Sequence, residues 1–166
     1  MIDYFQTLAG FNRWANARTF AAAATLSESD YRADRGAFFG SVHATLNHIL
    51  LVDHVWFGRL GVPVPGPESR SLDQILHDDL PSLTQGRRVM DDVIVGAVDR
   101  LSDADLVRTV VFRTTKGAEY SQRIDLTLGT VFNHAIHHRG QVHALLTQMG
   151  AEGPVLDLPA YLREVA

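Results

Sequence analysis

The sequence contains no cysteine. Disulfides, thiolate-bound metal ions, iron–sulfur clusters and a cysteine nucleophile are therefore excluded, and any chemistry has to come from imidazole, carboxylate, hydroxyl or a bound cofactor. An excess of positive charge is also lacking, because 15 Lys and Arg residues stand against 19 Asp and Glu residues, for a net charge of −4. The positive residues are scattered along the chain, so we expect no nucleic-acid-binding surface.

Long hydrophobic runs are missing as well. No stretch reaches the roughly 18 consecutive apolar residues that a membrane span requires. Asp3 stands where a secretory signal would carry positive charge, and the apolar stretch Ala21 to Ala24 is too short for the core of such a signal. We therefore expect a cytoplasmic protein without a membrane span. Its 166 residues are enough for one hydrophobic core, and we expect a single domain over residues 1–166.

Four segments have the apolar spacing of amphipathic helices. Ser41 is placed to cap the second of them, and Gly61 and Gly150 follow the second and fourth as C-terminal glycine signals. In the third, Ser71 to Gln74 has the form of a capping box, and Pro81 is expected to kink or restart the helix. The four segments are residues 3–26, 41–60, 71–98 and 127–149.

The connections between these segments differ in character. Residues 27–40 are polar, show no period and predict a loop. Residues 107–124 contain two short extended runs around Lys116-Gly117, which predict a short hairpin or an extended loop. The tail has at most one short helical turn near Tyr161. We therefore predict an all-α fold, an up-down four-helix bundle with a long connection between helices three and four that leaves room for a crossover.

Histidine is the residue type whose placement is most informative. Of the eight histidines, seven fall in two of the predicted helices. The exception is His77. The second helix carries His43, His48 and His54, and the fourth carries His134, His137, His138 and His143.

A pair of histidines on the fourth helix has the spacing of metal ligands. His134 and His138 are four residues apart and lie only about 40° from each other around the helix, one turn apart, so both imidazoles can reach one ion. A catalytic ion often has three protein ligands and keeps a position for water or substrate, so a third ligand would come from another helix. Histidine pairs at this spacing also occur on surfaces and in packed cores, and that alternative stays open.

The second helix offers three histidines for the third position. His43 and His54 share one face, whereas His48 lies about 140° and 120° from them, and only one face can point inward. The apolar neighbours of His48 favour the bundle interior, but periodicity alone does not exclude the other two. For His77, beside two aspartates, we expect a solvated position. For His137 and His143, which lie off the face of the pair, we expect packing or an interface.

Several motifs that would assign other chemistry are missing. Ala135 stands where the H-E-x-x-H motif of zinc proteases has its glutamate base. No histidine has a glutamate three residues before it, which excludes the E-x-x-H pairs of di-iron bundles. The sequence contains no G-x-S-x-G, G-x-G-x-x-G or G-x-x-x-x-G-K motif. These absences leave a mononuclear metal site made of histidines.

Three stretches of the chain resemble one family. The segment 133–143, N-H-A-I-H-H-R-G-Q-V-H, is similar to the H-x-x-x-H-R-G-Q signature helix of the DinB-like family. The stretch T-L-N-H-I-L-L-V-D at 45–53, with Trp56 and Arg59 behind it, resembles the second helix of that family, and F-N-R-W-A-N at 11–16 resembles its first. The resemblance extends over nearly the whole chain, including Leu156-Asp157-Leu158.

The resemblance implies a four-helix bundle, commonly a homodimer, that holds one divalent ion through three histidines. Carried over to this sequence, the ligands are His48, His134 and His138. All-nitrogen ligation suits nickel or zinc equally, so the sequence does not choose between them. Some relatives act on low-molecular-weight thiols, as S-transferases or as a thiol-dependent isomerase, and we find no feature that assigns this chain to one branch.

The leading hypothesis is a metal-dependent transferase in which a small thiol, deprotonated on the ion, attacks a small electrophilic substrate. If water took the thiol's position, a hydrolase would result. Gln141, about 20° from His134, is placed to hydrogen-bond a bound ligand or to orient a histidine. Arg139 is placed either to bind an anionic substrate or to lie at a surface or interface. The other hypotheses are a stress-associated protein that binds metal without turnover and a structural dimer with packed histidines.

Overall fold

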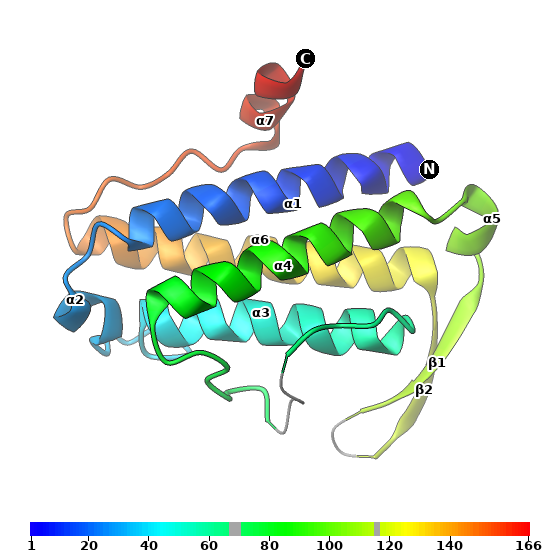
Figure 1. The fold of residues 1–166 in the computed structure, drawn as a ribbon, viewed down its shortest axis with the longest axis horizontal. Coiled ribbons are helices and arrows are strands. Elements are labelled where there is room, and N and C mark those ends of the chain that lie inside the picture. The colour runs from blue at the N-terminus through cyan, green and yellow to red at the C-terminus, as the bar shows by residue number, and fades with distance from the viewer. Residues whose placement is uncertain (67–70, 115–116) are drawn as a thin grey trace.

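A computed structural model describes residues 1–66, 71–114 and 117–166. Four long helices lie side by side, and three short helices and one hairpin lie outside this bundle (Figure 1). The elements in chain order are α1 (Ile2–Ala23), α2 (Glu28–Arg32), α3 (Val42–Arg59), α4 (Leu80–Asp99), α5 (Asp103–Leu106), β1 (Thr109–Arg113), β2 (Glu119–Arg123), α6 (Ile124–Gln148) and α7 (Leu158–Val165).

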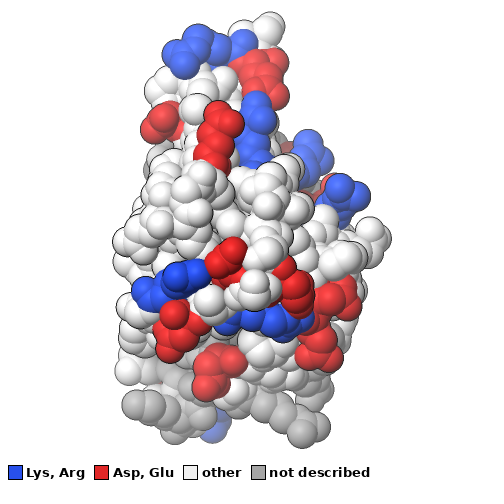
Figure 2. Space-filling model, turned by 90° about the vertical axis from the view of Figure 1, so that its left-hand side faces the viewer, with Lys and Arg blue, Asp and Glu red and all other residues white. Residues whose placement is uncertain are grey.

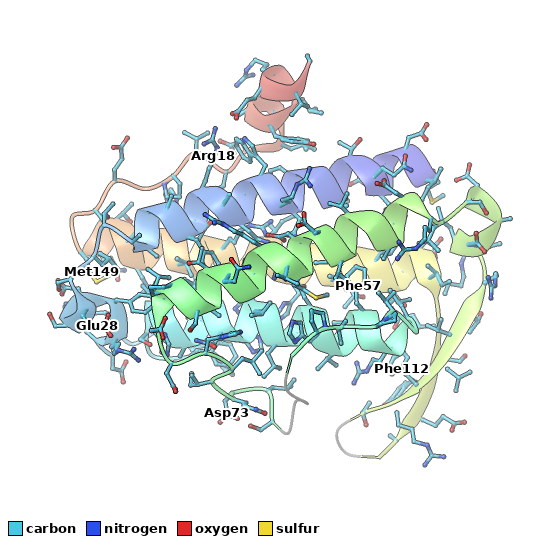
Figure 3. All side chains as sticks on the ribbon, in the orientation of Figure 1. Arg18, Glu28, Phe57, Asp73, Phe112 and Met149 are labelled. Carbon is cyan, nitrogen blue, oxygen red and sulfur yellow. The ribbon has the colours of Figure 1, made fainter. Side chains whose placement is uncertain are left out.

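The all-α fold predicted from the sequence is confirmed. In the bundle, α1 packs on α4 and α6, and α3 packs on α6 and α4. Large apolar side chains that are fully buried fill the space between these helices, among them Leu46, Phe57, Leu83, Ile94 and Leu128. Phe57, labelled in Figure 3, is a side chain of α3 within this core. None of the helices in the described ranges combines the length and apolar character needed to cross a membrane.

The bundle departs from a simple up-down order. Figure 1 shows that α3 and α4 run in the same direction, while α1 and α6 run opposite to them. The connection from α3 to α4 therefore has to return along the length of α3. The crossover that the sequence suggested between α4 and α6 is therefore in the wrong place: the connection from α4 to α6 leaves and re-enters the bundle at one end and contains α5 and the hairpin.

The helix boundaries follow the local signals in most places. Ser41 caps α3 by accepting a hydrogen bond from the Ala44 N–H, and Gly61 follows the helix with a φ of 76°. The predicted hairpin is present, with β1 and β2 antiparallel and Val111 opposite Ser121. The turn predicted at Lys116-Gly117 lies partly outside the described residues.

Three predictions about local structure are corrected. The capping box at Ser71–Gln74 does not start a helix; α4 begins at Leu80, with Asp79 as its N-cap and Pro81 in the first turn, where no backbone N–H is needed. The predicted loop at 27–40 contains α2, which Ser27 caps and which buries Tyr31. The tail forms two turns of helix rather than one, because Tyr161 of α7 packs against α1.

A buried network of polar and charged side chains joins the four long helices. Arg87 of α4 donates a hydrogen bond to Asp53 Oδ2 of α3 at 2.6 Å and forms an ion pair with Asp91 at 2.9 Å. The Asn16 amide of α1 donates to Asp91, and its carbonyl oxygen accepts from Arg139 of α6. All five side chains are at most 4% exposed, so their charges are shielded from water and depend on one another.

Removing one carboxylate of this network should destabilise the fold strongly. Asp53→Ala leaves the buried Arg87 guanidinium with one partner fewer, and we expect the free energy of unfolding to fall by about 3–5 kcal/mol. Urea denaturation measures the loss. Asp92→Ala is the control, because the exposed carboxylate of Asp92 on α4 pairs with Arg13 of α1 at 3.6 Å and its loss should change stability little. Equal losses in the two variants would contradict this account of the network.

Candidate metal centre

Three histidines from two helices, α3 and α6, meet in one cluster. His48 comes from α3, and His134 and His138 come from successive turns of α6. Ring centroids of the two α6 histidines are 4.3 Å apart, and that of His48 lies 4.9 and 4.7 Å from them. One possible ligand atom from each residue lies within 4.8 Å of the other two. The structure therefore brings together the three residues that the family resemblance implies as ligands.

Two of the imidazoles are held by hydrogen bonds that leave one ring nitrogen facing the cluster. His48 Nδ1 lies 2.7 Å from the carbonyl oxygen of Leu72, and His138 Nδ1 lies 2.8 Å from Gln141 Oε1. Because both partners are oxygen acceptors, each Nδ1 carries the proton and each Nε2 keeps a lone pair. A metal ion needs such a lone pair, and a hydrogen bond at the other ring nitrogen is the usual way to orient a ligand histidine.

The third imidazole contacts the first directly. His134 Nε2 lies 3.0 Å from His48 Nε2, while His134 Nδ1 is buried and has no partner among the described residues. Since His48 Nε2 is an acceptor, His134 donates from Nε2 in this contact; with its proton on Nδ1 instead, all three Nε2 atoms keep a lone pair. The spacing is close to that of a metal site, because nitrogen ligands about 2.1 Å from a tetrahedral ion lie about 3.4 Å apart.

Burial keeps these histidines neutral. It lowers the pKa of His48 and His138 from the usual value for histidine. The pKa of His134 falls to about 3, because burial and the neighbouring His138 and His48 all disfavour a charged ring. Neutral imidazole is the form that binds metal ions. Near neutral pH the three lone pairs are therefore available without loss of a proton from a charged ring.

The other two histidines of α3 are also buried, which corrects the expectation that only one face of this helix points inward. His43 Nδ1 lies 3.1 Å from the Tyr31 hydroxyl of α2. His54 is 8% exposed, and burial together with Arg87 lowers its pKa to about 4. The helix is covered on several sides, by α6, by α4 and by α2, so burial alone does not identify a ligand.

The remaining histidines lie outside the cluster. His77 is half-buried and covers Gly86 of α4, where a Cβ would lie 2.5 Å from its Nε2, so the predicted solvated position is wrong in part. His137 is exposed and accepts a hydrogen bond from the Gln141 amide at 3.2 Å. His143 is half-buried against Gly153. The Gln141 side chain thus links His137 to His138.

Arg139 has neither of the two roles expected for it. Its side chain is 2% exposed and donates hydrogen bonds to Asn12 and Asn16 of α1. Burial lowers the pKa of Arg139 to about 10. Arg139 is therefore a structural residue of the helix bundle, on the side of α6 that faces away from the histidine cluster.

Sequence reasoning missed Asn47, which holds the α3–α4 connection against the bundle. Its Oδ1 accepts hydrogen bonds from the backbone N–H groups of Leu76 and His77 at 2.9 and 3.0 Å. Its Nδ2 donates to the carbonyl oxygens of His43 and His77. The connection runs along α3, with Asp73 labelled on it in Figure 3. Asn47 thereby keeps the Leu72 carbonyl beside His48, and the only sequence signal was an asparagine next to a predicted ligand.

Replacing Asn47 should loosen this connection and release the His48 ring. In Asn47→Ala four hydrogen bonds are lost, and we expect faster amide exchange at Leu76 and His77 and a fall in stability of about 1–3 kcal/mol. Hydrogen exchange followed by NMR and urea denaturation measure the two effects. Asn133→Ala is the matched control, because Asn133 is exposed on α6. Unchanged exchange at residues 76 and 77 would show that Asn47 is not what holds the connection.

Comparisons with known proteins agree with this fold. The chain is 24% identical to Protein DinB of Bacillus subtilis (strain 168) over 169 residues, which cover 98% of this chain and 95% of that protein. Its structure resembles a DinB-like protein from Bacillus cereus ATCC 10987, with a TM-score of 0.67, 21% identity and coverage of 85% and 89% of the two chains. A DinB-like protein from Bacillus subtilis matches with a TM-score of 0.62, 20% identity and coverage of 92% and 98%. The model of the DinB family matches residues 1–165, and the chain belongs to that family.

Proposed function

We propose that this protein binds one divalent metal ion, nickel or zinc, through His48, His134 and His138, and that it uses the ion in a reaction of a low-molecular-weight thiol. The observation that carries the proposal is the cluster itself, in which three neutral imidazoles present nitrogen atoms to one point. Membership of the DinB family agrees with a metal centre of this kind.

The donor set decides what chemistry the centre supports. His48, His134 and His138 would hold the ion as neutral ligands, and a bound divalent ion would supply a full positive charge and open positions that favour the deprotonated form of a thiol. The chain has no cysteine, so the thiol has to come from solution. Its sulfur then forms a bond to a carbon of a small electrophile, whose leaving group departs with the electrons of the broken bond, while the thiol proton passes to solvent.

The residues around the ligands position them. The Leu72 carbonyl holds His48, and Gln141 holds His138, each through the Nδ1 proton. We propose that Gln141 contributes to cofactor binding in this way, by fixing the orientation of a ligand ring and by raising its basicity.

Three further expectations remain predictions. They are a homodimer, which the family resemblance implies, a cytoplasmic location, and the organisation of residues 1–166 as one domain.

Figure 2 shows positive and negative side chains interspersed on the end of the molecule that carries α2, without an extended positive surface on that face.

Metal content tests the first half of the proposal. Protein purified without an affinity tag should contain about one divalent ion per chain, and both His48→Ala and His138→Ala should lose it, measured by inductively coupled plasma mass spectrometry. Gln141→Ala should bind about 10- to 100-fold more weakly, because it removes only the partner of a ligand. His143→Ala is the control on the same helix. Wild-type protein without ion, and without a rise in melting temperature when Ni²⁺ or Zn²⁺ is added, would refute the site.

Turnover tests the second half. The metal-loaded protein is incubated with a panel of cellular thiols and the electrophile monobromobimane, and the conjugates are quantified by chromatography. We expect conjugation well above the uncatalysed rate in the wild type and in His143→Ala, and its loss in His138→Ala. Equal rates in the wild type and His138→Ala would leave a protein that binds metal without turnover.

A further inference from the structure

A short turn before α3 places two aromatic rings beside the histidine cluster. Residues 35–40 form this turn, which is closed by hydrogen bonds from the Arg35 N–H to the Gly40 carbonyl and from the Gly40 N–H to the Ala37 carbonyl, both 2.8 Å. Gly36 and Gly40 have φ values of 76° and 79°, which glycine adopts without strain. The turn is therefore fixed in shape, and the residues at its tip, Phe38 and Phe39, are held in place.

The ring of Phe39 forms one side of the metal centre. It stacks on the His48 imidazole with a centroid distance of 3.9 Å and an interplanar angle of 26°, and its centroid is 5.6 Å from that of His138. Phe39 thus contacts two of the three residues that would hold an ion, one from α3 and one from α6. Its ring therefore borders the cluster of ring nitrogens.

Phe38 extends this apolar surface into solvent. Its ring contacts that of Phe39 edge-on, with centroids 4.9 Å apart at 78°. It is 84% exposed, the highest value among the large hydrophobic residues that the structure describes. A single exposed apolar side chain needs no explanation. This one is different, because it continues a ring that already packs on a predicted ligand. We call Phe38 and Phe39 the aromatic wall.

The polar contacts that hold the cluster involve no charged side chain among the described residues: His48 Nδ1 pairs with the Leu72 carbonyl, His138 Nδ1 with Gln141, and His48 Nε2 with His134 Nε2. None of the ion pairs among the described residues includes a residue of the cluster or of the aromatic wall. The contacts that hold the cluster therefore bring no carboxylate or guanidinium to it. The aromatic wall, in contrast, offers a substrate apolar contact beside the cluster.

We propose that the aromatic wall binds an uncharged apolar group, preferably an aromatic ring, of the small molecule that reaches the metal centre. This inference rests on the proposed function, because it assumes that the molecule approaches a bound ion. It adds the substrate class: a compound whose reactive atom is next to an apolar or aromatic group, rather than one recognised by its charge. Offset or edge-on contacts with Phe38 and Phe39 would hold that group.

The test compares two primary thiols, only one of which carries a ring that the wall can contact. Benzyl mercaptan has an aromatic ring where 2-mercaptoethanol has a hydroxymethyl group. Each is titrated into the Co²⁺-loaded protein, where the charge-transfer band of a cobalt–sulfur bond reports binding. We expect Phe38→Ala and Phe39→Leu to weaken benzyl mercaptan about three- to tenfold, with the affinity for 2-mercaptoethanol unchanged. Tyr120→Ala, an exposed aromatic residue of β2, is the control and should change neither.

Two additional readouts separate the possible failures. The visible spectrum of Co²⁺ before thiol is added shows whether Phe39→Leu has disturbed the ligands, and Phe38→Ala makes the same comparison without touching His48. Amide shifts of Phe38 and Phe39 in the Zn²⁺-loaded protein report contact with benzyl mercaptan directly. Absence of a charge-transfer band with either thiol counts against the proposed function. Equal effects of the variants on both thiols, or no shift at Phe38 and Phe39, overturns the aromatic wall.

Discussion

The buried ion network between the four long helices is the constraint on which the rest of the molecule depends. Arg87 of α4 reaches Asp53 of α3, and Asp91 connects α4 to α1 through Asn16, which in turn accepts a hydrogen bond from Arg139 of α6. Buried charges need defined partners, whereas apolar side chains tolerate small rotations of a helix. Burial raises the pKa of Asp53 to about 6, even though Arg87 opposes that shift. The network therefore fixes how each helix is turned about its own axis.

This rotation places the histidines. Arg139 follows His138 directly, so the two side chains leave α6 about 100° apart. Arg139 points to α1, and His138, turned about 100° from it, lies beside His48 of α3. On α3, Asp53 follows His48 by five residues, about 140° around the helix, and the same reasoning holds. A network that contains none of the histidines thus determines how α3 and α6 are turned, and with it where the three imidazoles lie. The α3–α4 connection then sets the tautomer of His48.

Most of the scaffold could be predicted from the sequence, because local signals control it. Apolar spacing gave the four long helices, and Ser41 and Gly61 marked the ends of α3. The capping box at Ser71 failed because the segment behind it is held by Asn47, a contact about thirty residues away in sequence that outweighs a local preference. The predicted up-down order is wrong, because the spacing of apolar residues along a helix gives its buried face and not the direction in which the helix runs in the bundle.

The candidate metal centre could be predicted only in part. The spacing of His134 and His138 places both rings on one face of a helix, a property of the helix alone. His48 is harder, since α3 buries all three of its histidines. Its apolar neighbours favoured it without excluding the other two, and the family resemblance was needed to single it out. The oxygen that orients His48 belongs to the backbone of Leu72, and a backbone carbonyl leaves no mark in a sequence. The aromatic wall depends in the same way on how a turn folds over a helix.

The different supports of the ligand rings have a consequence for how such a centre changes over evolution. His138 is oriented from within its own helix, by Gln141 three residues later, so that arrangement is inherited with the helix. His48 is oriented by a segment outside the bundle. Insertions or deletions between α3 and α4 leave the packed core intact, yet they change which group meets His48 Nδ1. A lineage can therefore alter the orientation and basicity of the His48 ring through changes in a loop, without changes in the core.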